Sequence, residues 1–217
     1  MGETPGEVML TAVCFANRNH GWAVGHDAVV WKTTDGGESW KQQYSDPLNA
    51  EAGDESGGGA SDEASMSGDM SDLYSSGGDD DGDMSDLYGS DGGDDTGGGL
   101  APDTAGAPFL DVWCDTPEHV MAVGGFGYVL ESGDGGQSWR KRMDAFDNPD
   151  GWHLYSIRPV PRGDGTVLIA GERGTIFRSR DHGQNWESLK APYDGSFFGI
   201  TAAQRKTVLI HGLRGNV

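Results

Sequence analysis

An octapeptide with the pattern Ser/Thr-x-Asp-x-Gly-x-Ser/Asn-Trp occurs three times in this chain of 217 residues and limits the folds that it can adopt. The copies are TTDGGESW at 33–40, SGDGGQSW at 132–139 and SRDHGQNW at 179–186. Eight residues before each copy, a glycine ends a short apolar segment, and a fourth such segment lies near the end of the sequence. These glycines are Gly25, Gly124, Gly171 and Gly212. The chain is therefore an array of repeated units.

Each unit contains four short runs of β-branched and aromatic residues, separated by turns rich in Gly, Asp and Asn. Such runs predict antiparallel strands. A period of about 40–50 residues with four strands per unit is typical of a β-propeller. We therefore expect an all-β fold, a partial β-propeller of about three four-stranded antiparallel blades plus the start of another. The predicted blades span 7–45, 108–146 and 147–191, and an incomplete fourth blade spans 192–217.

Residues 46–107 interrupt the array with a segment rich in Gly, Asp and Ser. Residues 46–106 hold 17 of the chain's 35 acidic residues and no Lys or Arg. Low hydrophobicity with charge of one sign does not offset the entropy of ordering, so a long disordered acidic insertion is predicted. The sequence GDMSDLY occurs twice within it, at 68–74 and 82–88, which leaves short partner-binding segments as an alternative to a solvated loop. The carboxylates follow neither the EF-hand frame nor a nonapeptide calcium repeat, so no metal site is predicted.

Composition outside the insertion argues against several classes of protein. The remaining 18 acidic and 15 basic residues leave no basic field, which disfavours nucleic-acid binding. No apolar run is long enough to span a membrane, and the first residues, MGETPGEVML, show no signal peptide. Neither a phosphate-binding glycine loop nor a zinc-ligand spacing is present, so no cofactor is predicted.

Cys14 and Cys114 occupy the same relative place in two units, within TAVCFA and LDVWCD. The simpler interpretation is a pair of buried, unreactive thiols. A disulfide is the alternative, because neighbouring repeats can bring the two residues close together.

The octapeptide has the composition of a hairpin that holds itself together. Asp35 can accept hydrogen bonds from backbone amides of the turn, and Gly37 can adopt a positive φ. Thr33 and Ser39 offer hydroxyl groups to the two ends of the hairpin, and Trp40 can bury its ring against the sheet. We therefore assign a structural role to the corresponding residues of all three copies: Thr33, Asp35, Gly37, Ser39, Trp40, Ser132, Asp134, Gly136, Ser138, Trp139, Ser179, Asp181, Gly183, Asn185 and Trp186.

The octapeptide resembles the Asp box, or BNR repeat, which occurs in sialidases and in non-enzymatic propellers. A sialidase needs an arginine triad, a tyrosine nucleophile with a glutamate partner and an acidic general acid/base. Candidates for these roles are Arg158, Arg173, Arg178 and Tyr155, but the sequence has no Arg-Ile-Pro motif. A glycoside hydrolase of the Asp-box class is therefore the alternative and not the favoured function.

A wider resemblance covers most of the chain outside the acidic segment. HGWAVG at 20–25, LDVW at 110–113, AVGGFGYVLES at 122–132 and LIAGERGTIFRS at 168–179 are similar to the photosystem II assembly and stability factor-like propellers. GSFFG and GLRGN resemble bacterial members associated with resistance-nodulation-division (RND) transporters. The resemblance implies a non-catalytic scaffold that binds protein and assists a membrane complex, located in the periplasm or at a membrane. Members of this family usually carry an export signal and more blades, so a fragment without a function of its own is a further alternative.

Two glycine-flanked turns, GERG at 171–174 and GLRG at 212–215, place an arginine at the same position of successive units. Such arginines would gather on one face of a propeller and could bind an acidic partner through bidentate contacts. We therefore predict a partner-binding set of Arg173, Arg178, Arg180 and Arg214. The alternative is that these are solvated arginines paired locally. Unpaired edge strands also predict possible self-association.

Overall fold

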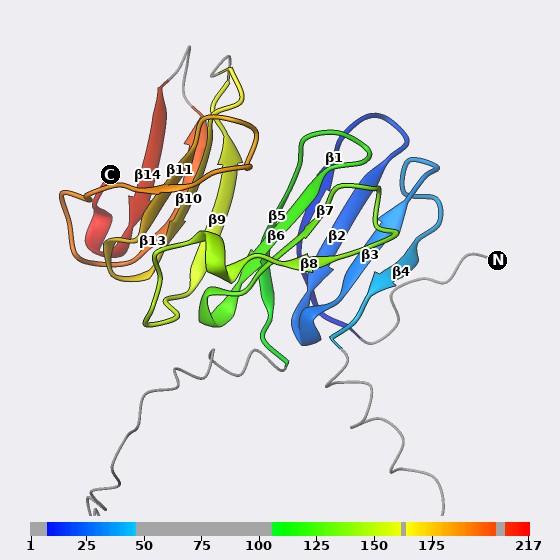
Figure 1. Cartoon of the computed structure of the whole chain (residues 1–217), viewed down its shortest axis with the longest axis horizontal. Helices are drawn as coiled ribbons and strands as arrows, with labels where there is room; N and C mark the ends of the chain where they lie inside the picture. The colour runs from blue at the N-terminus through cyan, green and yellow to red at the C-terminus, as the bar shows by residue number, and fades with distance from the viewer. Residues whose placement is uncertain (1–7, 47–105, 162–163, 203–206) are drawn as a thin grey trace, which may run out of the picture. The chain divides into compact units, whose positions relative to one another are not determined.

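The computed structural model describes residues 8–46, 106–161, 164–202 and 207–217, which form four antiparallel β-sheets (Figure 1). The first three sheets have four strands each and the fourth has two, which confirms the predicted fold class. The first sheet is made of β1 (Leu10–Phe15), β2 (Gly21–Gly25), β3 (Val30–Thr33) and β4 (Lys41–Tyr44). The second is made of β5 (Phe109–Cys114), β6 (Val120–Gly124), β7 (Val129–Ser132) and β8 (Arg140–Lys141). The third is made of β9 (Leu154–Pro159), β10 (Val167–Gly171), β11 (Ile176–Ser179) and β12 (Glu187–Ser188), and the fourth of β13 (Phe197–Ala202) and β14 (Val208–Gly212).

Every sheet is a meander in which strands that follow one another in sequence pair side by side. A single 3-10 turn joins the second strand of each sheet to the segment that follows it. These turns are η1 (His26–Ala28), η3 (Gly125–Gly127), η5 (Glu172–Gly174) and η6 (Leu213–Gly215), and a further 3-10 turn, η4 (Met143–Ala145), follows β8. Among the described residues, no helix is long and apolar enough to cross a membrane.

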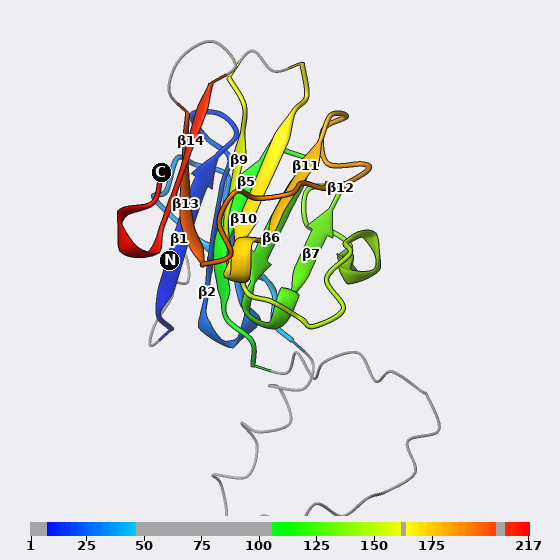
Figure 2. The same cartoon turned by 90° about the vertical axis from the view of Figure 1, so that its left-hand side faces the viewer.

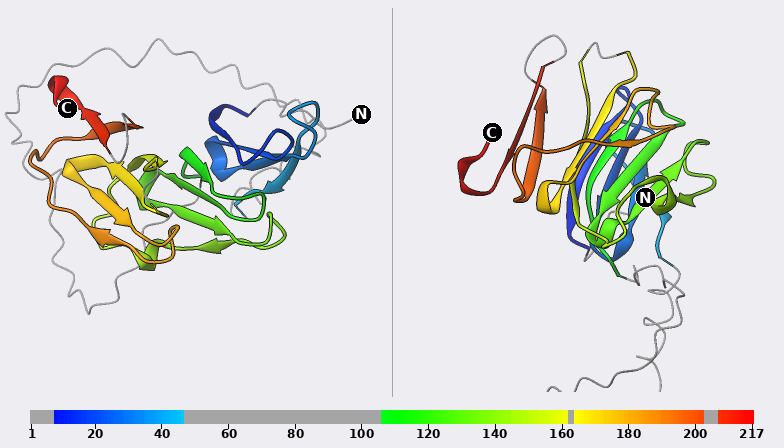
Figure 3. Two further views of the ribbon diagram at one scale, coloured as in Figure 1. Left: turned by 90° about the horizontal axis from the view of Figure 1, so that it is seen from above. Right: turned by 60° about the vertical axis from the view of Figure 1, so that its left-hand side comes forward.

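The sheets follow one another in chain order and touch through their first strands. β1 contacts β5, β5 contacts β9, and β9 contacts β13 (Figures 2 and 3). A separate hydrophobic core fills each of the three spaces between successive sheets. The first core holds Trp22 and Phe109, the second Met121 and Ile157, and the third Leu168. The apolar contacts that hold the chain together therefore lie between the sheets.

The glycine that ends the second strand of each sheet is required by a close approach of backbone. Gly124 has an extended φ of −165°, so a left-handed conformation does not explain its choice. A Cβ atom added to Gly124 would lie 2.1 Å from the carbonyl oxygen of Pro108, which precedes the first strand. The glycines at the same position of the other sheets, Gly25, Gly171 and Gly212, would meet a backbone carbonyl oxygen at 2.1–2.3 Å. Any side chain at these positions would push the first and second strands apart.

Both ends of the acidic insertion that the sequence predicts are anchored in the first core or beside it. The sequence predicts a disordered insertion over 46–107. Residues 47–105 of this insertion lie outside the described part of the structure. Asp46 itself is buried and accepts a hydrogen bond from the Tyr128 hydroxyl at 3.0 Å, and Tyr128 also contacts the hydroxyl of Tyr44 at 2.8 Å. Ala107 is buried in the first core. Asp46 and Ala107, the two ends of the predicted insertion, therefore belong to the packed part of the chain.

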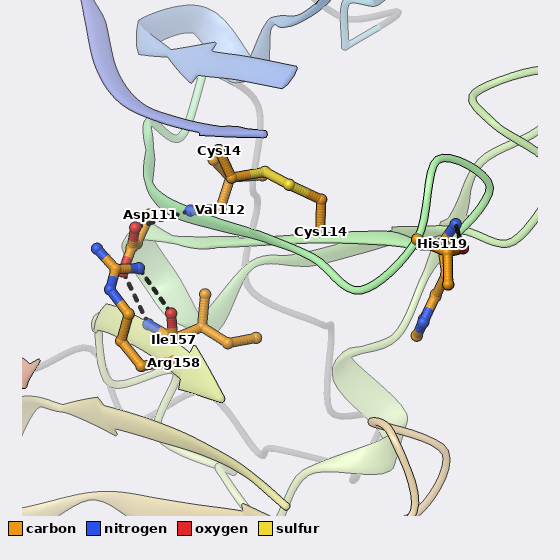
Figure 4. Close-up of a disulfide and its surroundings, with 8 residues drawn as sticks. Cys14, Asp111, Val112, Cys114, His119, Ile157 and Arg158 are labelled. Carbon is orange, nitrogen blue, oxygen red and sulfur yellow. Dashed lines mark hydrogen bonds and ion pairs between the residues drawn. A yellow bond between two sulfur atoms is a disulfide. The ribbon is translucent and has the colours of Figure 1, made fainter. Parts of the chain in front are cut away.

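Cys14 and Cys114 form a disulfide, so the simpler interpretation, two unreactive thiols, is wrong (Figure 4). Cys14 lies on β1 and Cys114 on β5, the first strands of neighbouring sheets. Their Cα atoms are 6.1 Å apart, within the range that a disulfide spans. The bond joins residues 100 positions apart, and it ties the first sheet directly to the second.

Removal of this disulfide is expected to lower the free energy of unfolding by about 4 kcal/mol, because the bond closes a very long loop in the unfolded chain. Urea unfolding followed by tryptophan fluorescence, with and without dithiothreitol, measures the change. A chain that carries both Cys14→Ser and Cys114→Ser is the control, and the reductant should leave its stability unaltered. Two titratable thiols in the unreduced native protein would contradict the assignment.

Candidate functional site

The three octapeptides have the same internal hydrogen bonds, and each is centred on its aspartate. In the first copy, the Thr33 hydroxyl donates to Asp35 Oδ1 at 2.7 Å, and the Ser39 backbone amide donates to the same oxygen at 2.9 Å. The Ser39 hydroxyl donates to Asp35 Oδ2. The Gly37 amide donates to the Thr33 hydroxyl oxygen at 2.9 Å, where Gly37 has a φ of 98°. The carboxylate is thus used by the hairpin itself.

The second and third octapeptides repeat these contacts with Asp134 and Asp181. Asp181 accepts from the Ser179 hydroxyl at 2.8 Å and from the Asn185 side-chain amide at 2.7 Å, so an asparagine replaces the second hydroxyl donor. The hydrogen bonds from Asn185, followed by the one from Ser179, lower the pKa of Asp181 to about 2. Hydrogen bonds from the equivalent donors hold the pKa of Asp35 and of Asp134 well below its ordinary value. A carboxylate that stays ionised and fully engaged in this way does not suit proton transfer.

The second and third octapeptides also connect their sheets to the one before. Trp139 packs edge-on against Trp22 of the first sheet, with ring centroids 5.8 Å apart. Trp186 packs against Phe146, which belongs to the core between the second and third sheets, at 5.1 Å. A Cβ atom on Gly136 would lie 2.7 Å from the ring of Trp22, so this glycine leaves room for the neighbouring sheet. The hairpin therefore acts as a structural contact between blades.

Two polar groups bridge the second and third sheets. Asp111 on β5 accepts hydrogen bonds from the backbone amide of Ile157 at 2.9 Å and from the guanidinium of Arg158, both on β9 (Figure 4). Buried Glu131 binds Arg142, whose guanidinium also donates to the Gln184 carbonyl oxygen in the third octapeptide at 3.1 Å. These bonds fix the register between the two sheets.

The predicted arginine set is divided between the two ends of the third and fourth sheets. Arg178 and Arg180 lie where β11 meets the third octapeptide, and both donate to Glu187 Oε1, at 2.6 Å and 3.1 Å. This is the local pairing that the sequence left open as the alternative. Arg173 and Arg214 lie in η5 and η6, at the opposite end of the strands (Figures 1 and 2).

The turns η1, η3, η5 and η6 present one exposed residue at the same position of each sheet. That residue has a left-handed backbone conformation, with φ between 50° and 59°. The four residues are Asp27, Phe126, Arg173 and Arg214. The guanidinium of Arg173 lies over the ring of Trp152, with its central carbon 4.8 Å from the ring centroid. This stacking orients the Arg173 side chain while leaving it exposed.

A row of aromatic rings extends from η3 to the fourth sheet beside these turns. Phe126 contacts His153 with ring centroids 5.0 Å apart, His153 contacts Tyr155 at 6.1 Å, and Tyr155 contacts Phe198 on β13 at 5.2 Å. Glu172 of η5 accepts a hydrogen bond from the His153 backbone amide at 3.3 Å. The two ends of the row are exposed, at 46% for Phe126 and 47% for Phe198. We call the row together with Arg173 and Arg214 the turn-end surface.

Sequence reasoning missed the aromatic part of this surface, because its members come from three different units. The only available signal was the occurrence of an aromatic residue at 126 in place of the charged residues at 27, 173 and 214. The sequence around Phe198, GSFFG, does not indicate that the side chain of Phe198 faces solvent.

The residues that a sialidase mechanism would use do not converge in the structure. Arg158 binds Asp111, Arg173 stacks on Trp152, and Arg178 binds Glu187. Burial, followed by the nearby charge of Glu172, raises the pKa of Tyr155, which is opposite to what an activated phenolate nucleophile requires. Among the described residues, no group of three or more His, Cys, Asp or Glu side chains could hold a metal ion.

The sheets follow one another in chain order, and an aspartate-centred hairpin follows the third strand of each four-stranded sheet. This arrangement defines a β-propeller with Asp boxes. Within this class, the chain belongs to the family described as Photosynthesis system II assembly factor YCF48, whose sequence profile matches residues 101–215. The match covers just over half of the chain.

The individual proteins that this chain is similar to are also described as YCF48 proteins. The Photosystem II assembly lipoprotein Ycf48 of Synechococcus sp. (strain CC9902) is 35% identical over 80 residues, which are 37% of this chain and 23% of that protein. A solved structure described as YCF48 bound to D1 peptide is 19% identical, with a TM-score of 0.58, and covers 96% of this chain and 50% of its own. YCF48 from Cyanidioschyzon merolae is 18% identical, with a TM-score of 0.59, over 99% of this chain and 53% of its own. At this identity the solved structures establish the fold, and the chain spans about half of their length.

The stability of the protein is expected to fall in acid because of Glu131. Burial raises the pKa of this carboxyl group, but hydrogen bonds from His119, Arg140 and Arg142 outweigh burial and lower the pKa from 4.5 to about 2. The folded state therefore binds a proton less readily than the unfolded chain does. The stabilisation, about 3 kcal/mol, is complete above pH 4.5 and is lost as the pH falls towards 2.

Urea unfolding at a series of pH values between 7 and 2 measures this loss. Glu131→Gln should be less stable at pH 7 and should lose less stability in acid. Glu38→Gln removes an exposed carboxylate and is the matched control, which should follow the unmodified protein. An equal loss of stability in acid for the Glu131→Gln chain would contradict the assignment.

Proposed function

We propose that this chain is a non-catalytic propeller module that binds a segment of another protein and so assists the assembly or operation of a membrane protein complex. Its membership in the YCF48 family supports this proposal. A solved member of that family is described as bound to D1 peptide, and the Synechococcus relative is described as a photosystem II assembly lipoprotein. Because the chain spans only part of these relatives, its own partner is inferred from its surface.

The turn-end surface is the region that we propose to bind the partner. The observation that carries this proposal is the row of rings from Phe126 to Phe198, exposed at both ends and flanked by Arg173 of η5. Rigid aromatic rings supply contact area at a low cost in side-chain entropy, and guanidinium groups bind carboxylates. Arg214 adds a second guanidinium in the equivalent turn of the fourth sheet. An extended peptide with apolar side chains and a carboxylate suits this combination.

Arg178 and Arg180 are not part of the turn-end surface, because they lie at the opposite end of β11. Their pairing with Glu187 leaves an exposed ion-pair cluster, with the Arg180 side chain 68% exposed. We propose that this cluster contributes less to partner binding than the turn-end surface does, because exposed ion pairs are screened by solvent and salt.

The kind of complex is also part of the proposal. An association with RND-type transporters, which GSFFG and GLRGN imply by resemblance, stays a prediction, since the relatives named above are described as YCF48 proteins. The Cys14–Cys114 disulfide favours an oxidising compartment, which supports the predicted periplasmic or membrane-associated location.

Peptide binding tests the proposed function directly. Fluorescence anisotropy with a dye-labelled D1 peptide should give saturable binding, while a scrambled peptide of the same composition should not bind. Phe126→Ala and Phe198→Ala should each weaken binding about tenfold or more, the loss expected when a central aromatic contact is removed. Arg173→Glu should weaken binding and reduce its dependence on salt.

Arg180→Glu is the matched control, because it makes the same charge change at the opposite end of the strands. Equal losses for Arg173→Glu and Arg180→Glu would contradict the placement of the binding surface. Turnover of a fluorogenic sialoside that Tyr155→Phe abolishes would contradict the non-catalytic function and favour the glycoside hydrolase.

A further inference from the structure

The side chain of Asn148 closes the turn that leads from the second sheet to the third. Its Nδ2 donates to the Trp152 carbonyl oxygen at 3.0 Å, and its Oδ1 accepts from the Trp152 backbone amide at 3.0 Å. The Gly151 amide donates to the Asn148 carbonyl oxygen at 3.1 Å, where Gly151 has a φ of 64°. One side-chain amide therefore fixes both backbone groups of Trp152.

This turn lies directly against η3 of the second sheet. A Cβ atom added to Gly127 would lie 2.6 Å from Asn148 Nδ2 and 3.5 Å from the Cα atom of Gly151. Phe146, in the core between the second and third sheets, accepts a hydrogen bond from the Asn148 amide at 2.9 Å through its carbonyl oxygen. The position of the turn is therefore set by contacts with the second and third sheets.

Trp152 connects this turn to the turn-end surface. The Arg173 guanidinium lies over its ring, with the central carbon 4.8 Å from the ring centroid. The next residue, His153, belongs to the aromatic row, and its carbonyl oxygen accepts from the Glu172 amide at 2.9 Å. The backbone is thus held at Trp152 by Asn148 and immediately after it by η5.

Arg173 differs from the other arginines of the second and third sheets in what holds its side chain. Five others bind a carboxylate: Arg140, Arg142, Arg158, Arg178 and Arg180. Arg173 forms no ion pair with any residue that the structure describes, and its guanidinium stacks on Trp152 instead. A guanidinium that stacks through its face keeps its N–H groups available for a ligand. The stack therefore orients the charge of Arg173 without neutralising it.

We propose that Asn148 is a positioning residue of the turn-end surface, because it holds the Trp152 ring in the place where that ring orients Arg173. The consequence for binding rests on the proposed function, whereas the orientation of Arg173 is a property of the free chain. Without the Asn148 amide, Trp152 loses both hydrogen bonds and the Arg173 side chain samples several rotamers. A partner must then order that side chain itself, which weakens binding.

Two-dimensional ¹H–¹⁵N NMR of the full 217-residue chain tests the orientation without a partner. The ring of Trp152 shifts the Nε–H resonance of Arg173, which is identified by its loss in Arg173→Lys. Asn148→Ala should move this resonance towards the position that it takes in Trp152→Ala. Asn185→Ala is the matched control, because it removes a side-chain amide that holds the third octapeptide at the opposite end of the same sheet. An Arg173 resonance that Asn148→Ala leaves in place would overturn the proposal.

Fluorescence anisotropy with the dye-labelled D1 peptide tests the consequence for binding. Asn148→Ala should weaken binding about two- to tenfold, the cost of ordering one long side chain, while Asn185→Ala should not. Trp152→Ala should weaken binding to a similar extent. The chain with both Asn148→Ala and Trp152→Ala should bind no more weakly than Trp152→Ala alone, because Asn148 acts through that ring. Additive losses, or unaltered binding by Asn148→Ala, would contradict the role in binding.

The two measurements separate this inference from the proposed function. An unmodified chain that does not bind the peptide contradicts the proposed function, and the NMR result still decides whether Asn148 positions Arg173. Circular dichroism verifies that each variant is folded. Asn148→Asp keeps the acceptor for the Trp152 amide and is the second variant if Asn148→Ala does not fold, with smaller changes of the same kind expected in both measurements.

Discussion

The packing of each sheet against its neighbours is the interaction on which the rest of this structure depends. A single unit of a repeat protein cannot bury its apolar face alone, and the stacking of neighbouring units buries it. In this chain each core takes side chains from two successive sheets, as Trp22 and Phe109 do in the first core. The disulfide, the Asp111–Arg158 contact and the tryptophans of the second and third octapeptides all cross these same spaces. We therefore expect the stability of each sheet to depend on the neighbouring sheets that cover it.

This dependence explains what the repeated octapeptide does in the fold. Its aspartate is occupied by the hairpin's own hydroxyl and amide donors. In the second copy the tryptophan packs on the sheet before it, and in the third copy it packs on the core that its sheet shares with the sheet before it. Such a motif sets the position of a blade and leaves the turns at the other end of the strands free to vary. The residue at the left-handed position of those turns changes from Asp27 to Phe126 and Arg173. Variation at a fixed backbone position is how a rigid scaffold presents different side chains to a partner.

The local features of the fold could be predicted from the sequence, because they depend on residues close together in the chain. The octapeptides and the strand-ending glycines Gly25 and Gly124 indicated the order and number of the strands, and hence the fold class. The glycines themselves were predicted for their position and not for the close approach to a carbonyl oxygen that requires them. That reason depends on the backbone of the first strand, which no local pattern describes.

Features that join separate units could not be predicted in the same way. The sequence left the pairing of Cys14 with Cys114 open, because the distance between two repeats depends on how the sheets pack. The aromatic row from Phe126 to Phe198 was missed for the same reason, since it spans three sheets. The four candidate arginines were grouped by their chemistry, whereas Arg173 and Arg178 lie at opposite ends of the strands. Side chains on different blades meet or separate according to packing that sequence periodicity does not encode.

Native-state hydrogen exchange tests the central claim most directly. If packing between sheets provides the stability, amides of β5, β6, β9 and β10, whose sheets are covered on both faces, should exchange most slowly. Amides of β2 and β3 in the first sheet, and of β13 and β14, should exchange faster, because the described residues pack against one face of each of those sheets. Equal protection of the first and second sheets would show that each blade is stable by itself and would contradict the account.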